Sequence, residues 1–380
     1  MKIIYVENVR VPSERAHAYQ IVQTCAWLGR FGHAVTLVNP SRAGDADVFK
    51  TYGLPERVFA HITLRAWDPL TSAPRFLKAA AYAVQRFAFA RALKAWARTE
   101  KADAWYTRDP SMLDALSGTV PGPWFLELHD APDNNPARWT RIRERVAGFV
   151  AISRGLKDKL AALGIPESKI CVAHDGYDPD LFAKSGNREA ERAALGIPAG
   201  AFAAIYTGSF YPWKGIDLAV RAWGRTDASA HLVLVGGPRA DRERIASLVE
   251  PGAATRIHIL PTTDRARAVA MLAAADVGLL ASSPDTSIGN VYTSPLKQFE
   301  YLAAGLPVLA SDVPSSHEIL DRATARFYEP SEEGFAKAVE AVRLDAAWRD
   351  AARQAARNVV TPYTWEARTR LVERCIRDHV

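Results

Sequence analysis

Short, continuously apolar segments alternate with helix-length segments along the whole chain, and this alternation limits the possible folds most. In the first half these segments are KIIYVEN (2–8), HAVTLVN (33–39), AWYTR (104–108), WFLELHD (124–130) and GFVAIS (148–153). In the second half they are FAAIYTG (202–208), HLVLVGG (231–237), RIHILP (256–261), DVGLLAS (276–282) and PVLAS (307–311). Apolar strands joined by helices are typical of parallel sheets covered on both faces. The sequence therefore predicts an α/β protein with doubly wound parallel sheets.

The chain is long enough for two domains. Its 380 residues exceed what one hydrophobic core usually serves. The strand pattern restarts after residues 175–187, DGYDPDLFAKSGN, which are polar and rich in turn residues, as linkers are. We therefore predict a Rossmann-like domain over residues 1–182 and a second one over residues 187–365. Ligands of such sheets bind at the carboxyl ends of the strands.

Composition narrows the classes of partner. The formal net charge of +6 and the pI of about 9.2 favour anionic partners such as phosphates, acidic glycans or anionic lipids. A basic surface without any partner fits these values equally well. Nucleic acid is disfavoured, because the sequence lacks zinc-finger spacing, an RNP-like stretch and a Lys/Arg block. It also lacks a run of about 18 apolar residues, the length that a transmembrane helix needs.

The cysteines and the first residues predict a cytoplasmic protein. Cys25, Cys171 and Cys375 are far apart and lack metal-ligand spacing, which indicates buried thiols in a reducing compartment. The opening MKIIYVENV is interrupted by Glu7 too early for a signal peptide and reads as a strand.

The segment 73–98 is a long helix that is rich in aromatic and basic residues, with its apolar residues all round. A packed domain helix is the favoured interpretation. The alternative is a patch for an anionic membrane surface, containing Arg86, Arg91 and Lys94, on the inner face of the cytoplasmic membrane.

Residues 293–312, TSPLKQFEYLAAGLPVLASD, begin with a helix start and end as a buried strand. Ser294 suits the N-cap and Pro295 the first helical position. The N–H groups of Leu296 and Lys297 then point out of the helix start, where the helix dipole favours an anion. A cation at position 297 opposes the dipole, and a bound diphosphate would remove that conflict. The segment therefore predicts a diphosphate site.

Glu300 lies three residues after Lys297, on the same face of the predicted helix. A carboxylate one turn away from a phosphate site can accept both hydroxyls of a ribose. The alternative is an ordinary Lys–Glu pair on a solvated helix.

This segment resembles the donor-binding segment of the family-4 retaining glycosyltransferases, which have the GT-B fold. In that family, the second glutamate of a Glu-x7-Glu signature binds the nucleotide ribose, and Glu300 matches it. Tyr292 stands where the first glutamate meets the donor sugar, so it is a candidate for the acceptor side. The resemblance implies two Rossmann-like domains facing across a cleft and a nucleoside-diphosphate sugar as co-substrate, with UDP or GDP as the nucleotide. It also implies that neither a metal nor another cofactor is required.

Residues 206–223, YTGSFYPWKGIDLAVRAW, resemble the family's glycine-loop segment, whose arginine and lysine hold the donor diphosphate. Lys214 matches the lysine, whereas Ser209 replaces the arginine. In our interpretation Lys297 supplies the missing charge, since two cations on a diphosphate stabilise the leaving group. A strand-turn-helix with a lysine at its turn is also common without any function.

Candidates in the first domain lie where its strands end. His129 matches the family's histidine near the donor sugar, and Asp130 follows it. A structural histidine is the alternative. Arg108 is an acceptor or phosphate contact, or forms an ion pair with a nearby aspartate. Arg15 and His17 occupy the loop after the first strand, where the family usually carries glycines, and are acceptor-side candidates, or simply an ordinary polar helix start.

The combined prediction is a retaining glycosyltransferase of the hexosyltransferase type that acts in glycan, glycolipid or polysaccharide biosynthesis. The resemblance implies metal-independent front-face displacement with His129, Lys214 and Glu300 as catalytic residues. It also implies a terminal helix, residues 366–380, that crosses back to the first domain. Two alternatives stay open: a nucleotide-sugar epimerase on the same fold and a non-catalytic nucleotide-sugar-binding protein. The acceptor is a sugar or a lipid-linked glycan.

Overall fold

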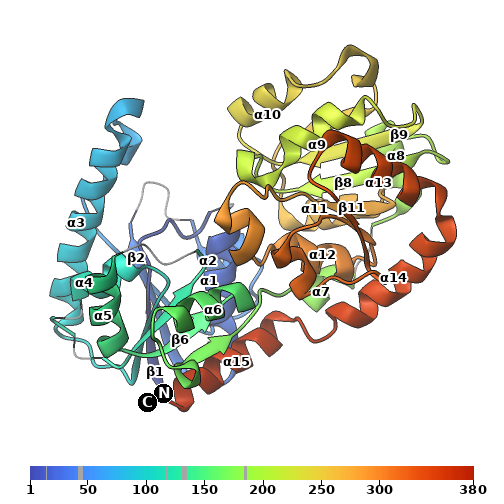
Figure 1. Ribbon diagram of the computed structural model, residues 1–380. Helices are drawn as coiled ribbons and strands as arrows, with labels where there is room; N and C mark the ends of the chain where they lie inside the picture. Colours follow the sequence, from blue (N-terminus) through green and yellow to red (C-terminus); the bar gives the residue numbers. More distant parts are fainter. Residues whose placement is uncertain (14, 42–45, 117, 121, 131–134, 184–185) are drawn as a thin grey trace. The chain divides into compact units, whose positions relative to one another are not determined.

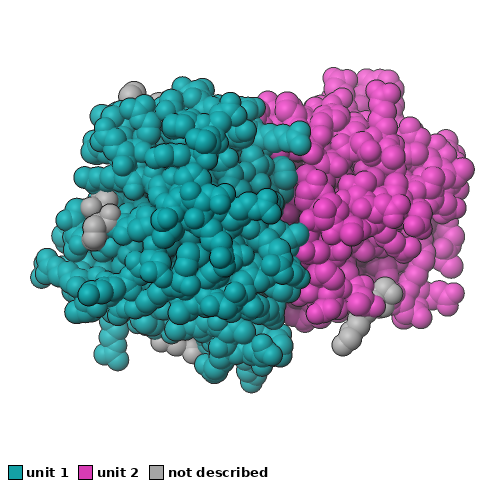
Figure 2. Space-filling model, turned by 90° about the horizontal axis from the view of Figure 1, so that it is seen from below, with its two compact units in different colours: residues 1–174, 365–380 teal, residues 175–364 magenta. Residues whose placement is uncertain are grey.

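The computed structural model describes residues 1–380 except 14, 42–45, 117, 121, 131–134 and 184–185. The chain forms two compact units, coloured separately in Figure 2. Unit 1 contains Met1–His174 together with Trp365–Val380, and unit 2 contains Asp175–Thr364. Both are α/β units with parallel sheets, which confirms the predicted fold class (Figure 1).

Unit 1 is built on a seven-stranded sheet with the order β3-β2-β1-β4-β5-β6-β7. Every neighbouring pair in it is parallel. The strands are β1 Lys2–Val6, β2 Ala34–Pro40, β3 Ala60–Leu64, β4 Ala104–Thr107, β5 Trp124–Leu128, β6 Val146–Ala151 and β7 Ile170–Val172. The strand order reverses between β1 and β4, so ligands of this unit are expected at the carboxyl ends of these strands.

The helices of unit 1 connect these strands. They are α1 Ala16–Arg30, α2 Val48–Thr51, α3 Lys78–Ala97, α4 Pro110–Leu116, α5 Pro136–Arg145 and α6 Arg154–Ala162, with 3₁₀ turns at Pro69–Thr71, Arg75–Leu77 and Glu167–Lys169. A last helix, α15 Trp365–Arg377, returns from unit 2 and packs against α1, β6 and β7. Its residues Val372, Cys375 and Ile376 belong to the hydrophobic core of unit 1.

Helix α3 differs from its prediction in how its apolar residues are arranged. Ala81, Gln85, Phe89, Leu93 and Ala97 recur every four residues and are buried along one side. Most other side chains in the first half of α3 are exposed, so only one side of this part of the helix is packed. Among the residues that the structure describes, no helix has both the length and the apolar character needed to cross a membrane.

Unit 2 is built on a six-stranded parallel sheet with the order β10-β9-β8-β11-β12-β13. The strands are β8 Phe202–Thr207, β9 Ala230–Val235, β10 Ile257–Leu260, β11 Val277–Leu280, β12 Val308–Ser311 and β13 Ala325–Tyr328. The order reverses between β8 and β11, which places the expected ligand site at their carboxyl ends.

The helices of unit 2 are α7 Pro179–Phe182, α8 Arg188–Leu195, α9 Ile216–Trp223, α10 Arg239–Ala246, α11 Arg265–Leu272, α12 Leu296–Ala303, α13 Glu332–Leu344 and α14 Ala346–Val360. The 3₁₀ turns are Pro212–Lys214, Pro251–Ala253 and Pro314–Glu318, and a π-helical turn spans Ile288–Tyr292. The predicted helix within residues 293–312 and the strand after it are thus present as α12 and β12.

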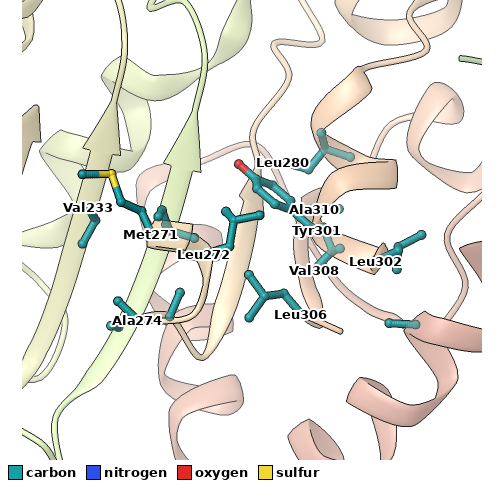
Figure 3. Packing of buried hydrophobic residues seen from close by; sticks show 14 of the residues in the cluster. Val233, Met271, Leu272, Ala274, Leu280, Tyr301, Leu302, Leu306, Val308 and Ala310 are labelled. Carbon is teal, nitrogen blue, oxygen red and sulfur yellow. The ribbon is translucent and has the colours of Figure 1, made fainter. Parts of the chain in front are cut away.

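Helix α12 is fixed to the sheet by its apolar side. Tyr301 packs among Leu280, Val308 and Ala310, as Figure 3 shows. The Tyr301 hydroxyl accepts a hydrogen bond from the backbone N–H of Thr207, at 3.0 Å, where β8 ends. This packing holds the opposite side of α12 beside the loop that follows β8, and both segments carry predicted site residues.

Candidate functional site

The start of α12 lies one residue later than predicted. Pro295 is the N-cap, with extended backbone angles, and its carbonyl oxygen accepts from the N–H of Gln298 at 3.1 Å. The prediction that Ser294 is the N-cap is therefore wrong. The Ser294 hydroxyl is used elsewhere, because it accepts a hydrogen bond from the backbone N–H of Asp175 at 3.2 Å. The predicted helix-start amide of Leu296 remains in the first turn.

Lys297 is a buried cation without an anionic hydrogen-bond partner among the described residues. Its side chain is 7% exposed, and its Nζ has no hydrogen-bond acceptor there. The Nζ lies 3.4 Å from the centroid of the Tyr206 ring, a cation–π contact. Burial and the neighbouring Lys214 lower the pKa of Lys297 well below its usual value, against the opposing charge of Glu300. A bound anion would strongly stabilise the charged form of a buried, unpaired lysine.

Lys214 is held beside Lys297 by the turn that joins β8 to α9. The 3₁₀ turn Pro212–Lys214 ends at Gly215, whose φ of 70° is in the left-handed region that glycine favours. The Lys214 Nζ lies 3.7 Å from the centroid of the Trp213 ring. Burial lowers the pKa of Lys214 to about 7. The structure therefore brings together the two lysines that the sequence analysis assigned to the diphosphate.

A glycine in the loop after β8 lies against the Lys297 side chain. Gly208 has a φ of 130°, and a Cβ at this position would lie 3.4 Å from the Lys297 Nζ. Ser209, which follows it, accepts a hydrogen bond at its backbone carbonyl from the Tyr206 hydroxyl at 2.7 Å. A glycine here lets a ligand approach the backbone and Lys297 closely.

Glu300 does not form the predicted alternative pair with Lys297. Its Oε1 accepts from the Nη2 of Arg265, the first residue of α11, in a short ion pair. Arg265 was not among the predicted site residues. The available signal was its position shortly after the predicted strand RIHILP, at the carboxyl edge where ligands bind. Tyr292 is partly buried at the end of the π-helical turn before α12, a type of turn that is frequent at functional sites.

The predicted site residues of unit 1 lie at the carboxyl ends of β4 and β5 and at the start of α1. The Arg108 guanidinium donates to the side chain of Gln20 at 2.6 Å and to the carbonyl of His17 at 3.3 Å. Arg15 is exposed and provides the N-cap of α1 without a capping hydrogen bond from its side chain. Asp130 is exposed next to the partly buried His129.

Glu127, which was not among the predicted site residues, connects these residues. Its carboxylate is fully buried in β5 and accepts hydrogen bonds from Gln20 and Arg368, each at 2.6 Å, and from His129 and Tyr106 at shorter distances. The signal was present in WFLELHD, where one ionisable residue interrupts an otherwise apolar strand.

Metal ligands are not clustered in the described part of the chain, where no group of three or more His, Cys, Asp or Glu side chains could hold an ion. Asp178 has a local structural role, since its side chain caps α7 by accepting from the N–H of Asp180 at 3.1 Å.

Two family models match this chain. Residues 201–345 match a family described as glycosyl transferases group 1, and residues 18–181 match glycosyltransferase family 4. Among curated proteins, a D-inositol 3-phosphate glycosyltransferase of Mycobacterium leprae (strain Br4923) is 33% identical over 151 residues, covering 38% of this chain and 33% of that protein. The protein of the same name from Mycobacterium tuberculosis (strain ATCC 25177 / H37Ra) is 30% identical over 216 residues, covering 54% and 43%. The matches thus span less than half the length of these relatives.

Solved structures support the fold over nearly the whole chain. A sucrose-phosphate synthase from Thermosynechococcus elongatus has a TM-score of 0.81 at 20% identity and covers 99% of this chain and 98% of its own. The Anabaena protein HepE, in complex with UDP-glucose, has a TM-score of 0.76 at 16% identity with both chains fully covered. At these identities the likeness concerns the fold, and the predicted GT-B class is confirmed.

Proposed function

The chain belongs to the family-4, group 1 glycosyltransferases, and from that premise we propose that it transfers a sugar from a nucleoside-diphosphate sugar to an acceptor hydroxyl, with retention of configuration. The observation that carries the proposal is Lys297, a buried ammonium group that has no hydrogen-bond acceptor among the described residues. The charges that act on it are those of Lys214 and of Glu300, whose carboxylate is already paired with Arg265. A diphosphate supplies the missing negative charge.

Each donor group has a partner in unit 2. Lys214, Lys297 and the N–H of Leu296 bind the diphosphate, while Ser294 and Pro295 shape the turn before it. The ion pair with Arg265 uses Oε1 of Glu300, so Oε2 is left to accept from a ribose hydroxyl. UDP is the first nucleotide to test, since HepE has a structure with UDP-glucose, and GDP is the second.

The reaction we propose is a front-face displacement. The bond between the sugar C1 and the diphosphate oxygen breaks, the acceptor oxygen forms the new bond to C1, and its proton passes to the leaving phosphate. The two lysines stabilise the negative charge that develops on the diphosphate, without a metal. Positioning of the reacting groups supplies much of the remaining acceleration.

The test is a thermal-shift and transfer panel with UDP-, GDP-, ADP- and TDP-sugars in EDTA. A ligand that binds only the folded state raises the melting temperature by mass action. We expect one nucleotide class to stabilise the wild type, Glu300→Ala to abolish the shift, and the exposed Glu333→Ala, on α13 in the same unit, to retain it. An unchanged shift in Glu300→Ala refutes the nucleotide placement. Release of a new sugar from the donor without acceptor favours the epimerase alternative, and binding without turnover favours the non-catalytic one.

We further propose that the acceptor is a lipid-linked glycan and that the first half of α3 contacts an anionic membrane. Phe76 and Phe87 are 84% and 72% exposed, and Trp67, Leu77 and Tyr82 are exposed nearby in the sequence. Helix α3 carries four basic residues and no acidic residue over Lys78–Ala97. Exposed aromatic side chains together with uncompensated positive charge suit a surface of anionic lipids.

Co-sedimentation with vesicles of phosphatidylglycerol and phosphatidylcholine tests this contact. We expect Phe87→Ser, or Arg86→Gln with Arg91→Gln, to reduce binding about tenfold or more, since each basic residue near such a surface contributes about 1 kcal/mol. The control is Leu344→Ser, which alters an equally exposed side chain of unit 2 (72%). Equal binding of the wild type to neutral vesicles, or unchanged binding of the α3 variants, refutes the membrane contact.

A further inference from the structure

Glu127 of unit 1 is highly connected by hydrogen bonds, and no family motif assigns it. Glu127 is 0% exposed and accepts four hydrogen bonds, from Gln20 on α1, Tyr106 on β4, Arg368 on α15 and His129. A buried, ionised carboxylate needs several hydrogen-bond donors, because these replace the water molecules that would otherwise hydrate it. The network is therefore built around the charge of Glu127.

The hydrogen bond between His129 and Glu127 determines which ring nitrogen of His129 carries the proton. The Nε2 of His129 contacts Oε1 of Glu127, and a carboxylate can only accept. The proton of the neutral ring is therefore on Nε2, and Nδ1 keeps its lone pair. The His129 side chain is 21% exposed, so a ligand can reach it.

The charge of Glu127 is balanced by a residue from the far end of the chain. Arg368 is 1% exposed, and its Nη2 donates to Glu127 at 2.6 Å across 241 residues of sequence. Its Nη1 donates to the Thr24 hydroxyl on α1 at 3.1 Å. Without this guanidinium, the buried carboxylate would lose its directly paired cation, since the His129 ring is neutral, and such an unpaired charge is costly.

We propose that Glu127 is a positioning residue that holds His129 as the neutral Nε2–H tautomer with Nδ1 as a hydrogen-bond acceptor, and that Arg368 of the C-terminal helix makes this possible. An acceptor nitrogen suits a sugar hydroxyl, which would donate to it. The assignment of the sugar rests on the proposed function, whereas the tautomer and its dependence on Arg368 do not.

The electrostatics of the site agree with a neutral ring. Burial lowers the pKa of His129 to about 3, Arg108 adds to the effect, and Glu127 opposes it. Arg368 and His129 together hold the pKa of Glu127 far below its usual value despite burial. The other titratable or charged groups around the pair are Glu7, which follows β1, together with Tyr5, Cys25, Tyr106, Arg108, Asp130 and Cys171.

The first experiment is NMR of the histidine rings in the full-length protein from pH 5 to 9, with His129→Asn to assign the signal. We expect the His129 signals of the wild type to be those of an Nε2–H tautomer and not to titrate. In Arg368→Met the pKa of His129 should rise into this range, because a repulsive cation is lost and Glu127 loses its main partner. Arg370→Met, an exposed arginine of the same helix that pairs with Glu366, should behave like the wild type.

Two further variants keep the test decisive if Arg368→Met does not fold. Arg368→Lys keeps the charge and should keep the tautomer. The double variant Glu127→Leu/Arg368→Met removes both charges and every acceptor at position 127, so it should fold better than Arg368→Met alone and lose the fixed tautomer. A wild-type His129 that titrates near its ordinary value of about 6.5 overturns the proposal, as does an unchanged tautomer in the double variant.

Kinetics separate this inference from the proposed function. With a donor and acceptor identified, the double variant should lose kcat on the order of 100-fold with little change in donor KM, since misplacement by about an ångström costs that much. A fixed tautomer in a wild type that transfers no sugar refutes the proposed function and leaves the positioning role intact. A wild type that transfers sugar but whose His129 titrates near its ordinary value refutes the positioning role and leaves the proposed function intact.

Discussion

Replacing Lys297 with methionine should stabilise the protein without ligand and weaken its donor binding, and these opposite signs distinguish a ligand site from a structural lysine. The ammonium group is buried without a hydrogen-bond acceptor in the described residues, and its cation–π contact with Tyr206 is its compensation. Burial of an unpaired charge costs several kcal/mol, and a desolvated cation–π contact returns about 2 kcal/mol. Methionine has a similar length and no charge.

The net gain should be about 1–3 kcal/mol in the free energy of unfolding of unit 2, after the lost cation–π contact is subtracted. For a unit of this size, that raises its melting temperature by roughly 3–9 °C. Removal of a charge-assisted hydrogen bond to the diphosphate costs about 1.5–3 kcal/mol of binding. The Kd for UDP or GDP should therefore rise about 10- to 150-fold.

Scanning calorimetry without ligand and titration calorimetry with UDP and GDP measure the two effects on the same preparations. The gain in stability should shrink as the pH rises toward 10.5, the ordinary pKa of lysine. Because the pKa of Lys297 is lowered in the folded protein, its ammonium group loses its proton within this range, and the energetic cost of burying a charge disappears with the proton. The control is Lys337→Met, an exposed lysine of the same unit paired with Glu333, which should change neither quantity. Lower stability of Lys297→Met together with an unchanged Kd would show that Lys297 is structural.

Three further predictions concern single residues. Gly236→Ala should destabilise unit 2 by more than about 2 kcal/mol, because its φ is 131° and a Cβ there would lie 2.2 Å from a backbone oxygen; Gly252→Ala, with open space around it, is the control in a urea titration. Burial raises the pKa of Glu7 to about 8, so the stability of unit 1 should fall as the pH rises from about 4.5 to about 8, and Glu7→Gln should remove that slope in urea melts across pH. Ser294→Ala should cost about 1 kcal/mol, since the backbone N–H of Asp175 loses its acceptor, and an unchanged urea midpoint contradicts this.

Predictions based on local pattern agree best with the structure. The alternating apolar runs predicted parallel α/β sheets, and each of the ten segments contains one of the thirteen strands or most of one. Strands that are buried on both faces must be apolar throughout, so they can be recognised from a short stretch of sequence without knowledge of their contacts in the fold. The turn that contains Lys214 and the helix that carries Glu300 were also predictable from local sequence, because glycine and proline restrict or permit backbone conformations at their own positions.

Predictions that depend on partners far apart in the sequence agree least. Ser294 has the chemistry of an N-cap, but the N–H of Asp175, 119 residues away in the sequence, takes its hydroxyl. The carboxylate of Glu300 was predicted correctly to be in the helix, but its pairing with Arg265 depends on how α11 packs. A capping or charged side chain can bind any of several possible partners. The sequence shows which partners exist, but only the fold shows which of them lies within bonding distance.

The sequence by itself thus determined the fold class, the position of most strands and the family resemblance of the donor segment. The tertiary structure decided which polar groups are buried together: Lys297 next to Lys214, and Glu127 next to Arg368 and His129. Burial changes the protonation of these groups, because a low-dielectric surrounding penalises every charge that lacks a partner. That penalty depends on contacts between distant parts of the chain, which only the folded protein brings together.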